Sequence, residues 1–125
     1  MSRRTLQRGR GGATGRGDDV GAVIDSARQQ WEDGRRRLEA EAVEPVRYGQ
    51  LQALVDVVLA ELRRLIGQRF ALGELAAQHA TAEDWARDAI EDALPPEPKV
   101  GVRDVPLVVD AAFYLYARGA TDYEP

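Results

Sequence analysis

Apolar positions recur at helical spacing over most of this chain after residue 18. In the range 46–66 they form one broad face, with a polar opposite face, Pro45 in front and Gly67 directly behind. Spacings of three and four residues are typical of an amphipathic helix, and the proline and glycine mark its two limits. The pattern therefore predicts a helix over 46–66 at the centre of a helical core. Its apolar face comprises Leu51, Leu54, Val55, Val58, Leu62, Leu65 and Ile66.

A narrower apolar stripe precedes this helix and predicts an amphipathic helix within 18–44. Its residues are Val20, Ile24, Ala27, Trp31 and Leu38. A stripe of this width can dock on its own domain or on another chain, including a second copy through 18–40. We interpret Trp31 as a packing anchor because it lies on the stripe, and we keep it as a candidate partner contact if the stripe faces another protein.

Three shorter helical segments complete the pattern, at 72–79, 82–94 and 106–118. The dipeptide Ala80-Thr81 separates the first two, and "PPEP" at 95–98 ends the second. A chain of 125 residues is long enough for one domain with a buried core. We therefore expect an all-α fold, a small bundle of about five helices, with a core domain at 45–119 and a short tail at 120–125.

The net charge of -4 hides a basic N-terminus attached to an acidic body. Residues 1–17 contain five arginines and no acid, which leaves -9 for residues 18–125. Too few apolar side chains are present in 1–17 to offset the entropy of ordering, so we predict a disordered tail. The tail is either a solvated extension or an arm whose arginines contact phosphates or an acidic surface. The contacts of such an arm would include Arg3, Arg4, Arg8 and Arg10.

The stretch "FALGELAAQHATAEDWARDAI" at 70–90 has the outline of a helix-turn-helix. A short corner between two helices in a core gives the same pattern. Charge favours the corner, because the segment 82–93 carries five carboxylates against Arg87 alone, a net of -4. Such a helix would be repelled by the phosphates beside a DNA groove. We interpret the corner as architecture and its acidic face as at most a surface for a basic partner. The candidate contacts on this face are Glu83, Asp84, Arg87 and Asp88.

Few residues offer catalytic or metal-binding chemistry. The chain has no cysteine and a single histidine, His79, so disulfides, thiolate sites and histidine-based zinc sites are excluded. No phosphate-binding glycine loop and no nucleophile elbow are present, so we expect no enzyme and no cofactor. Asp56 and Asp110 lie in apolar runs, and we interpret both as paired structural carboxylates rather than catalytic acids. We expect Asp110 to pair with Arg103, Arg118 or an arginine of the 46–66 helix, and we assign His79 no chemical role.

No apolar run approaches the length that spans a bilayer, and the arginine-rich N-terminus is not a secretory signal, so we expect a cytoplasmic protein. The leading hypothesis for function is a non-enzymatic protein-interaction or regulatory module. The alternative is a nucleic-acid-associated protein that binds weakly through the N-terminal arm. A pattern of exposed charge and amphipathic stripes favours the first, and the five arginines of 1–17 favour the second.

The segments "LAELRRLIGQRFALGELAAQHATAEDWARDAI" and "VVDAAFYLYARGATDYEP" resemble small helical proteins common in actinobacteria, a group without an assigned function. The resemblance covers about residues 50–125 and carries no functional residues to transfer. It implies a bacterial, cytoplasmic, single-domain protein.

Overall fold

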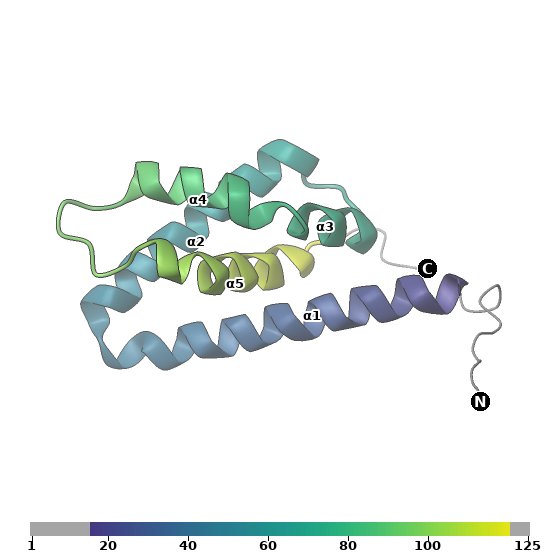
Figure 1. Ribbon diagram of the computed structural model, residues 1–125, viewed down its shortest axis with the longest axis horizontal. Coiled ribbons are helices and arrows are strands. Elements are labelled where there is room, and N and C mark those ends of the chain that lie inside the picture. Colours follow the sequence, from purple (N-terminus) through teal and green to yellow (C-terminus); the bar gives the residue numbers. More distant parts are fainter. Residues whose placement is uncertain (1–15, 121–125) are drawn as a thin grey trace, which may run out of the picture.

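The computed structural model describes residues 16–120, with side chains described from residue 21, and its elements are all helical (Figure 1). The α-helices are α1 (Arg16–Ala40), α2 (Pro45–Ile66), α3 (Leu72–His79), α4 (Ala82–Ala93) and α5 (Val105–Ala117). Two 3-10 turns, η2 (Glu41–Val43) and η3 (Val102–Asp104), precede α2 and α5. The prediction of an all-α bundle of about five helices is confirmed. Residues 1–15 of the predicted disordered tail and the segment 121–125 lie outside the described residues. The prediction of disorder is wrong for residues 16 and 17, which form the start of α1.

Helix α5 contacts each of the other four α-helices, with α1 on one side and α2 and α4 on the other (Figure 1). The predicted central helix α2 packs mainly against α5 and α4. The sequence of α5 explains this position. A helix that is apolar on all sides is stable only when other helices surround it. Its buried residues are Val105, Val108, Val109, Asp110, Ala111, Ala112 and Phe113.

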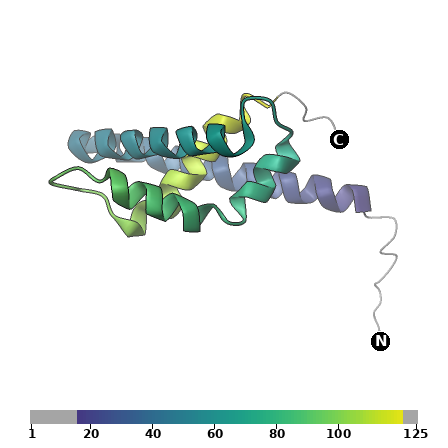
Figure 2. The same ribbon diagram turned by 90° about the horizontal axis from the view of Figure 1, so that it is seen from above.

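Helix α1 packs along α5 through its C-terminal half and extends past α5 at its N-terminal end (Figures 1 and 2). Trp31 and Leu38 are buried in this contact, and Gly34 lies between them on the same stripe. A Cβ at Gly34 would lie only 2.4 Å from the Cβ of Asp110. The two helices therefore approach so closely that position 34 has no room for a side chain.

The loop between α2 and α3 is fixed by backbone conformation and by α5. Gly67 has a φ of 75°, a conformation that favours glycine, and its carbonyl accepts a hydrogen bond from the Tyr116 hydroxyl. Phe70 stacks on Tyr116 with ring centroids 4.8 Å apart. At the next corner, Thr81 precedes α4, but its hydroxyl donates back to the Gln78 carbonyl rather than capping α4.

An ion-pair network holds the start of α2 to the turn before α5. Arg47 donates to both carboxylate oxygens of Asp104, at 2.8 and 3.2 Å, to Glu41 at 2.8 Å, and to the Lys99 carbonyl. Burial alone would raise the pKa of Asp104, but hydrogen bonds from Arg47 and the Gly101 N–H outweigh it and hold that pKa below its ordinary value. Local sequence patterns do not predict this network, because its main partners are 57 residues apart.

Candidate functional site

The predicted contact residues fall into three groups in the structure. Trp31 is 1% exposed, and its ring packs against Phe113 and His79 at centroid distances of 5.6 and 5.7 Å. The prediction that Trp31 contacts a partner is therefore wrong, because α5 and α3 already cover its ring, and the packing-anchor interpretation is confirmed. The contacts predicted on α4 are all exposed, and Arg3, Arg4, Arg8 and Arg10 lie outside the described residues.

The exposed side of α4 is acidic, as the sequence predicts. Its charged residues, all exposed, are Glu83, Asp84, Arg87, Asp88, Glu91 and Asp92. None of them forms an ion pair with another described residue, so the spacing of Glu83 and Arg87 does not produce the surface pair that it favours. Ala82, Ala86 and Ile90 face the core and hold α4 against α2 and α5.

A groove of about 440 Å³ runs between the N-terminal half of α1 and α3, and we call it the α1–α3 groove. Most of its walls are small side chains: Ala22, Ser26 and Ala27 on α1, Ala76 on α3, and Ala80 directly after α3. Val23 lies on the α1 wall and is 62% exposed, the second largest exposed fraction among the large apolar side chains of the described residues. Small walls beside an exposed valine offer a surface on which another helix can approach closely.

One end of the α1–α3 groove meets a polar cluster that joins three helices. His79 of α3 lies with its Nε2 2.9 Å from the Oδ1 of Asp110 on α5, and the Gln30 amide of α1 donates to both Asp110 oxygens at 3.3 and 3.4 Å. A carboxylate only accepts hydrogen bonds, so the Nε2–H of His79 is the donor. Both Gln30 and His79 also line the groove.

The pairing of Asp110 corrects one detail of the sequence analysis. Asp110 is buried and paired, which confirms the structural interpretation, but its partners are His79 and Gln30 rather than an arginine. His79 repeats the spacing of Leu72, Leu75 and Ala76, so the apolar face of α3 turns it inward. This spacing was the signal that could have identified the partner. Asp56, by contrast, is exposed and makes no ion pair with a described residue, so the paired interpretation is wrong there.

The polar cluster contains an aspartate and a histidine beside a serine, which raises the question of nucleophilic chemistry. Ser26 lines the same groove as His79, but no hydrogen bond joins their side chains in the described structure. A serine nucleophile needs such a bond to a base, together with donors for the oxyanion. The hydrogen bonds of Gln30 and His79 to Asp110 instead connect α1, α3 and α5. Within residues 16–120 no group of three or more histidine, aspartate or glutamate side chains is arranged to hold a metal ion.

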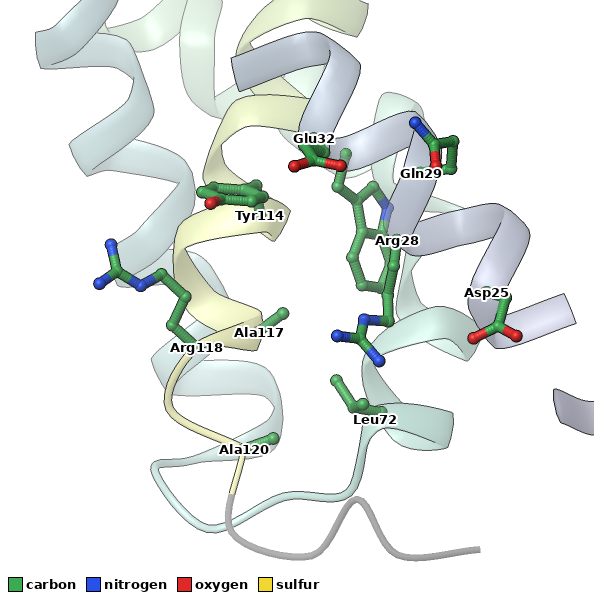
Figure 3. A pocket seen from close by; sticks show the side chains of 10 residues that line it. Asp25, Arg28, Gln29, Glu32, Leu72, Tyr114, Ala117, Arg118 and Ala120 are labelled. Atoms are coloured by element: carbon green, nitrogen blue, oxygen red, sulfur yellow. The ribbon is translucent and has the colours of Figure 1, made fainter. Parts of the chain in front are cut away.

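A second groove, of about 740 Å³, lies between α1 and the C-terminal end of α5, and we call it the α1–α5 groove (Figure 3). Arg28, Gln29 and Glu32 line it from α1, and Tyr114 and Ala117 line it from α5. The α1–α5 groove is more polar than the α1–α3 groove and carries charges of both signs. The Arg35 guanidinium lies 5.6 Å from the centre of the ring of Tyr114, one of the lining residues.

No helix of the described chain is long and apolar enough to cross a membrane. Comparisons with protein-family models, with curated proteins and with solved structures gave no match to this chain.

Proposed function

We propose that this chain is a non-enzymatic protein-interaction module, and that it holds a helical segment of another protein in the α1–α3 groove. The observation that carries the proposal is the exposed apolar wall of α1 at this groove, where Val23 is 62% exposed beside small side chains. An amphipathic helix gains stability when its apolar residues are covered, and the described residues leave Val23 on this half of α1 exposed.

Helical packing favours a helix as the bound segment. The walls of the groove are themselves two helices, and small residues such as Ala22, Ser26 and Ala76 let a third helix backbone approach them. A partner with an apolar stripe of its own would bury Val23 and extend the contact that α1 makes with α5. The polar cluster of His79, Asp110 and Gln30 keeps α1 and α3 at a fixed spacing, so the groove exists before the partner binds.

A photo-reactive amino acid at position 23 tests this proposal in cells. We expect a defined crosslinked product between the chain and one partner, identified by mass spectrometry. The same amino acid at position 43 is the matched control, because Val43 is 91% exposed but lies in η2, away from the groove. The crosslinked protein should then bind the purified chain and lose affinity for a Val23→Asp variant.

The outcomes separate the candidate partners. A product specific to position 23 that contains a second protein supports the proposal. A product of two copies of this chain would instead show self-association through α1, the other possibility for the 18–40 stripe. Identical products at positions 23 and 43, or unchanged binding by Val23→Asp, would contradict a site in the α1–α3 groove.

The alternative function is nucleic-acid binding through the arginines of residues 1–17. The five arginines support it, while the exposed acidic side of α4 argues against binding through the 70–90 corner. Deleting residues 1–15, which leaves the described α1 whole, should abolish any salt-sensitive binding of DNA or RNA if the arm is responsible. Binding that survives this deletion would contradict the alternative.

A further inference from the structure

The α1–α3 groove has an apolar end and a polar end. Along α1, its wall runs from Val23 to Gln30, with Ser26 between them. Gln30 lies close to His79 of α3, because both side chains donate to the carboxylate of Asp110. The seven-residue spacing of Val23 and Gln30 corresponds to about two helical turns, or about 10 Å. A partner helix that follows α1 therefore meets the two ends with side chains about two turns apart.

The polar end presents hydrogen-bond acceptors. The Nε2–H of His79 donates to Asp110, so in the neutral imidazole the other ring nitrogen, Nδ1, is an acceptor. The Gln30 side chain uses its N–H group for Asp110 in the same way, which leaves its carbonyl oxygen Oε1 as an acceptor. Neither Nδ1 nor Oε1 has a hydrogen-bond partner among the described residues, and both side chains line the groove. A bound segment that supplies donors would satisfy both atoms.

The charge around the polar end is negative. The side chain of Asp110 is 7% exposed, and no lysine or arginine of the described chain pairs with it. The exposed Glu83 and Asp84 follow Ala80, which lines the groove, by only three and four positions. None of the described residues that line the groove is a lysine or an arginine. A donor that carries a positive charge therefore fits this end better than a neutral or an acidic side chain.

We propose that the helix held in the α1–α3 groove carries a basic residue about two helical turns from the apolar residue that covers Val23. This inference rests on the function proposed for the groove and names the residue type that makes a partner specific. Lysine and arginine side chains only donate hydrogen bonds, which matches the free acceptors of His79 and Gln30. The groove then selects its partner by a spaced pair of residues rather than by apolar surface alone.

Two synthetic helical peptides test this inference with the full chain. Both have an alanine-rich stripe with a central leucine, and they differ only at the two positions seven residues before and after it. One peptide carries lysine at both positions and the other carries glutamine, so that either orientation of the peptide presents the same pair. We expect the lysine peptide to bind about threefold more tightly, measured from the amide NMR signals of Val23 and Ser26.

Gln30→Lys and Gln29→Lys are matched variants, because they add the same charge at neighbouring positions of α1 and only Gln30 lines the α1–α3 groove. Gln30→Lys should remove the preference for the lysine peptide, whereas Gln29→Lys should retain it. Equal binding of both peptides by the wild type, or equal effects of the two variants, would overturn the inference and leave the groove as a binding site. If neither peptide shifts the signals of Val23 and Ser26, the groove itself is contradicted together with this inference.

The position of the ring hydrogen on His79 gives a separate readout of the acceptor. His79 is the only histidine of the chain, so its ring nitrogen NMR signals need no assignment among several residues. In mildly alkaline solution, they should show the hydrogen on Nε2, toward Asp110, and none on Nδ1. A hydrogen on Nδ1 would make this atom a donor, and would overturn the inference.

Discussion

The two halves of α1 both carry apolar residues, but these residues are buried to different extents. In the C-terminal half, Trp31 and Leu38 of the stripe are buried against the bundle. In the N-terminal half, Ile24 and Ala27 of the stripe are half-buried, and Val23 beside them is 62% exposed. The difference arises because α1 extends past the end of α5 (Figure 1). An amphipathic stripe is therefore covered only as far as its neighbour extends. The partner that we propose would bind the N-terminal half, where Val23 is exposed.

The largest contrast should appear when one apolar side chain is removed from each half. Trp31→Ala should lower the free energy of unfolding by about 3–5 kcal/mol, because the ring is fully enclosed by Phe113, His79 and their neighbours. Val23→Ala should change it by less than about 0.5 kcal/mol, because that side chain faces solvent. Urea unfolding of both variants measures the difference. Equal losses would show that the N-terminal half is as well covered as the C-terminal half.

Glycines provide a second contrast along the same helix. Gly34→Ala should destabilise the protein by about 1–3 kcal/mol, since the new Cβ would meet Asp110 at 2.4 Å and the backbone of Ala111 at 3.3 Å. Gly21→Ala is its control, because no atom lies within 4 Å of a Cβ there, and better helix propensity should stabilise it by up to about 1 kcal/mol. Thermal unfolding compares the two. A stabilised Gly34→Ala variant would mean that α1 and α5 separate at little cost.

These two contrasts also show what the sequence can and cannot predict. Local periodicity and helix-end residues predict all five helices, because spacing, Pro45 and Gly67 act within one segment. The periodicity also predicts that Trp31 packs in the core. It does not predict where a stripe stops being covered, because this depends on the lengths of helices that are distant in sequence. The sequence shows that Gly34 interrupts the apolar stripe of α1. It does not show the reason, which is that α5 packs closely against α1 at this position.

The candidate grooves depend on the same long-range information. Asp110 is recognisable as a paired carboxylate from its apolar surroundings, but its partner His79 is 31 residues away and its partner Gln30 is 80 residues away. The α1–α3 groove is formed by small residues on two helices, and alanines carry no chemical signal that would mark a site. The sequence shows on which face of its own helix a residue lies. It does not show which faces of two different helices pack against each other, because that depends on the fold.

The polar cluster between the two halves of α1 should show an intermediate effect. Asp110→Ala removes the acceptor shared by His79 and Gln30, and should destabilise the fold by about 2 kcal/mol because these donors lose their partner. Asp56→Ala is the matched control, since Asp56 is an exposed carboxylate on α2. Urea unfolding should separate the two variants clearly. If Asp110→Ala is as stable as Asp56→Ala, the cluster does not hold α1 and α3 to α5.

The smallest expected effect concerns the end of α1, where Glu41 of η2 reaches Arg47 and, through it, Asp104. Because the pKa of Asp104 is lower in the folded state than its ordinary value of 3.8, its carboxylate stabilises the fold above that value. This contribution is lost as the pH falls through the lower, folded pKa. Asp104→Asn should therefore be less stable than the wild type by about 1 kcal/mol at neutral pH, and this difference should shrink in acid.

Urea unfolding of the wild type and Asp104→Asn over a series of pH values measures that convergence. Asp56→Asn is again the matched control, because this exposed carboxylate makes no ion pair with a described residue and its variant should follow the wild type at every pH. A stability difference for Asp104→Asn that stays constant down to acid pH would mean that the Arg47–Asp104 contact acts through packing rather than through charge. In that case, the charge of Asp104 would not help to fix the C-terminal end of α1, and the contrast between the two halves of α1 would depend on their coverage by α5.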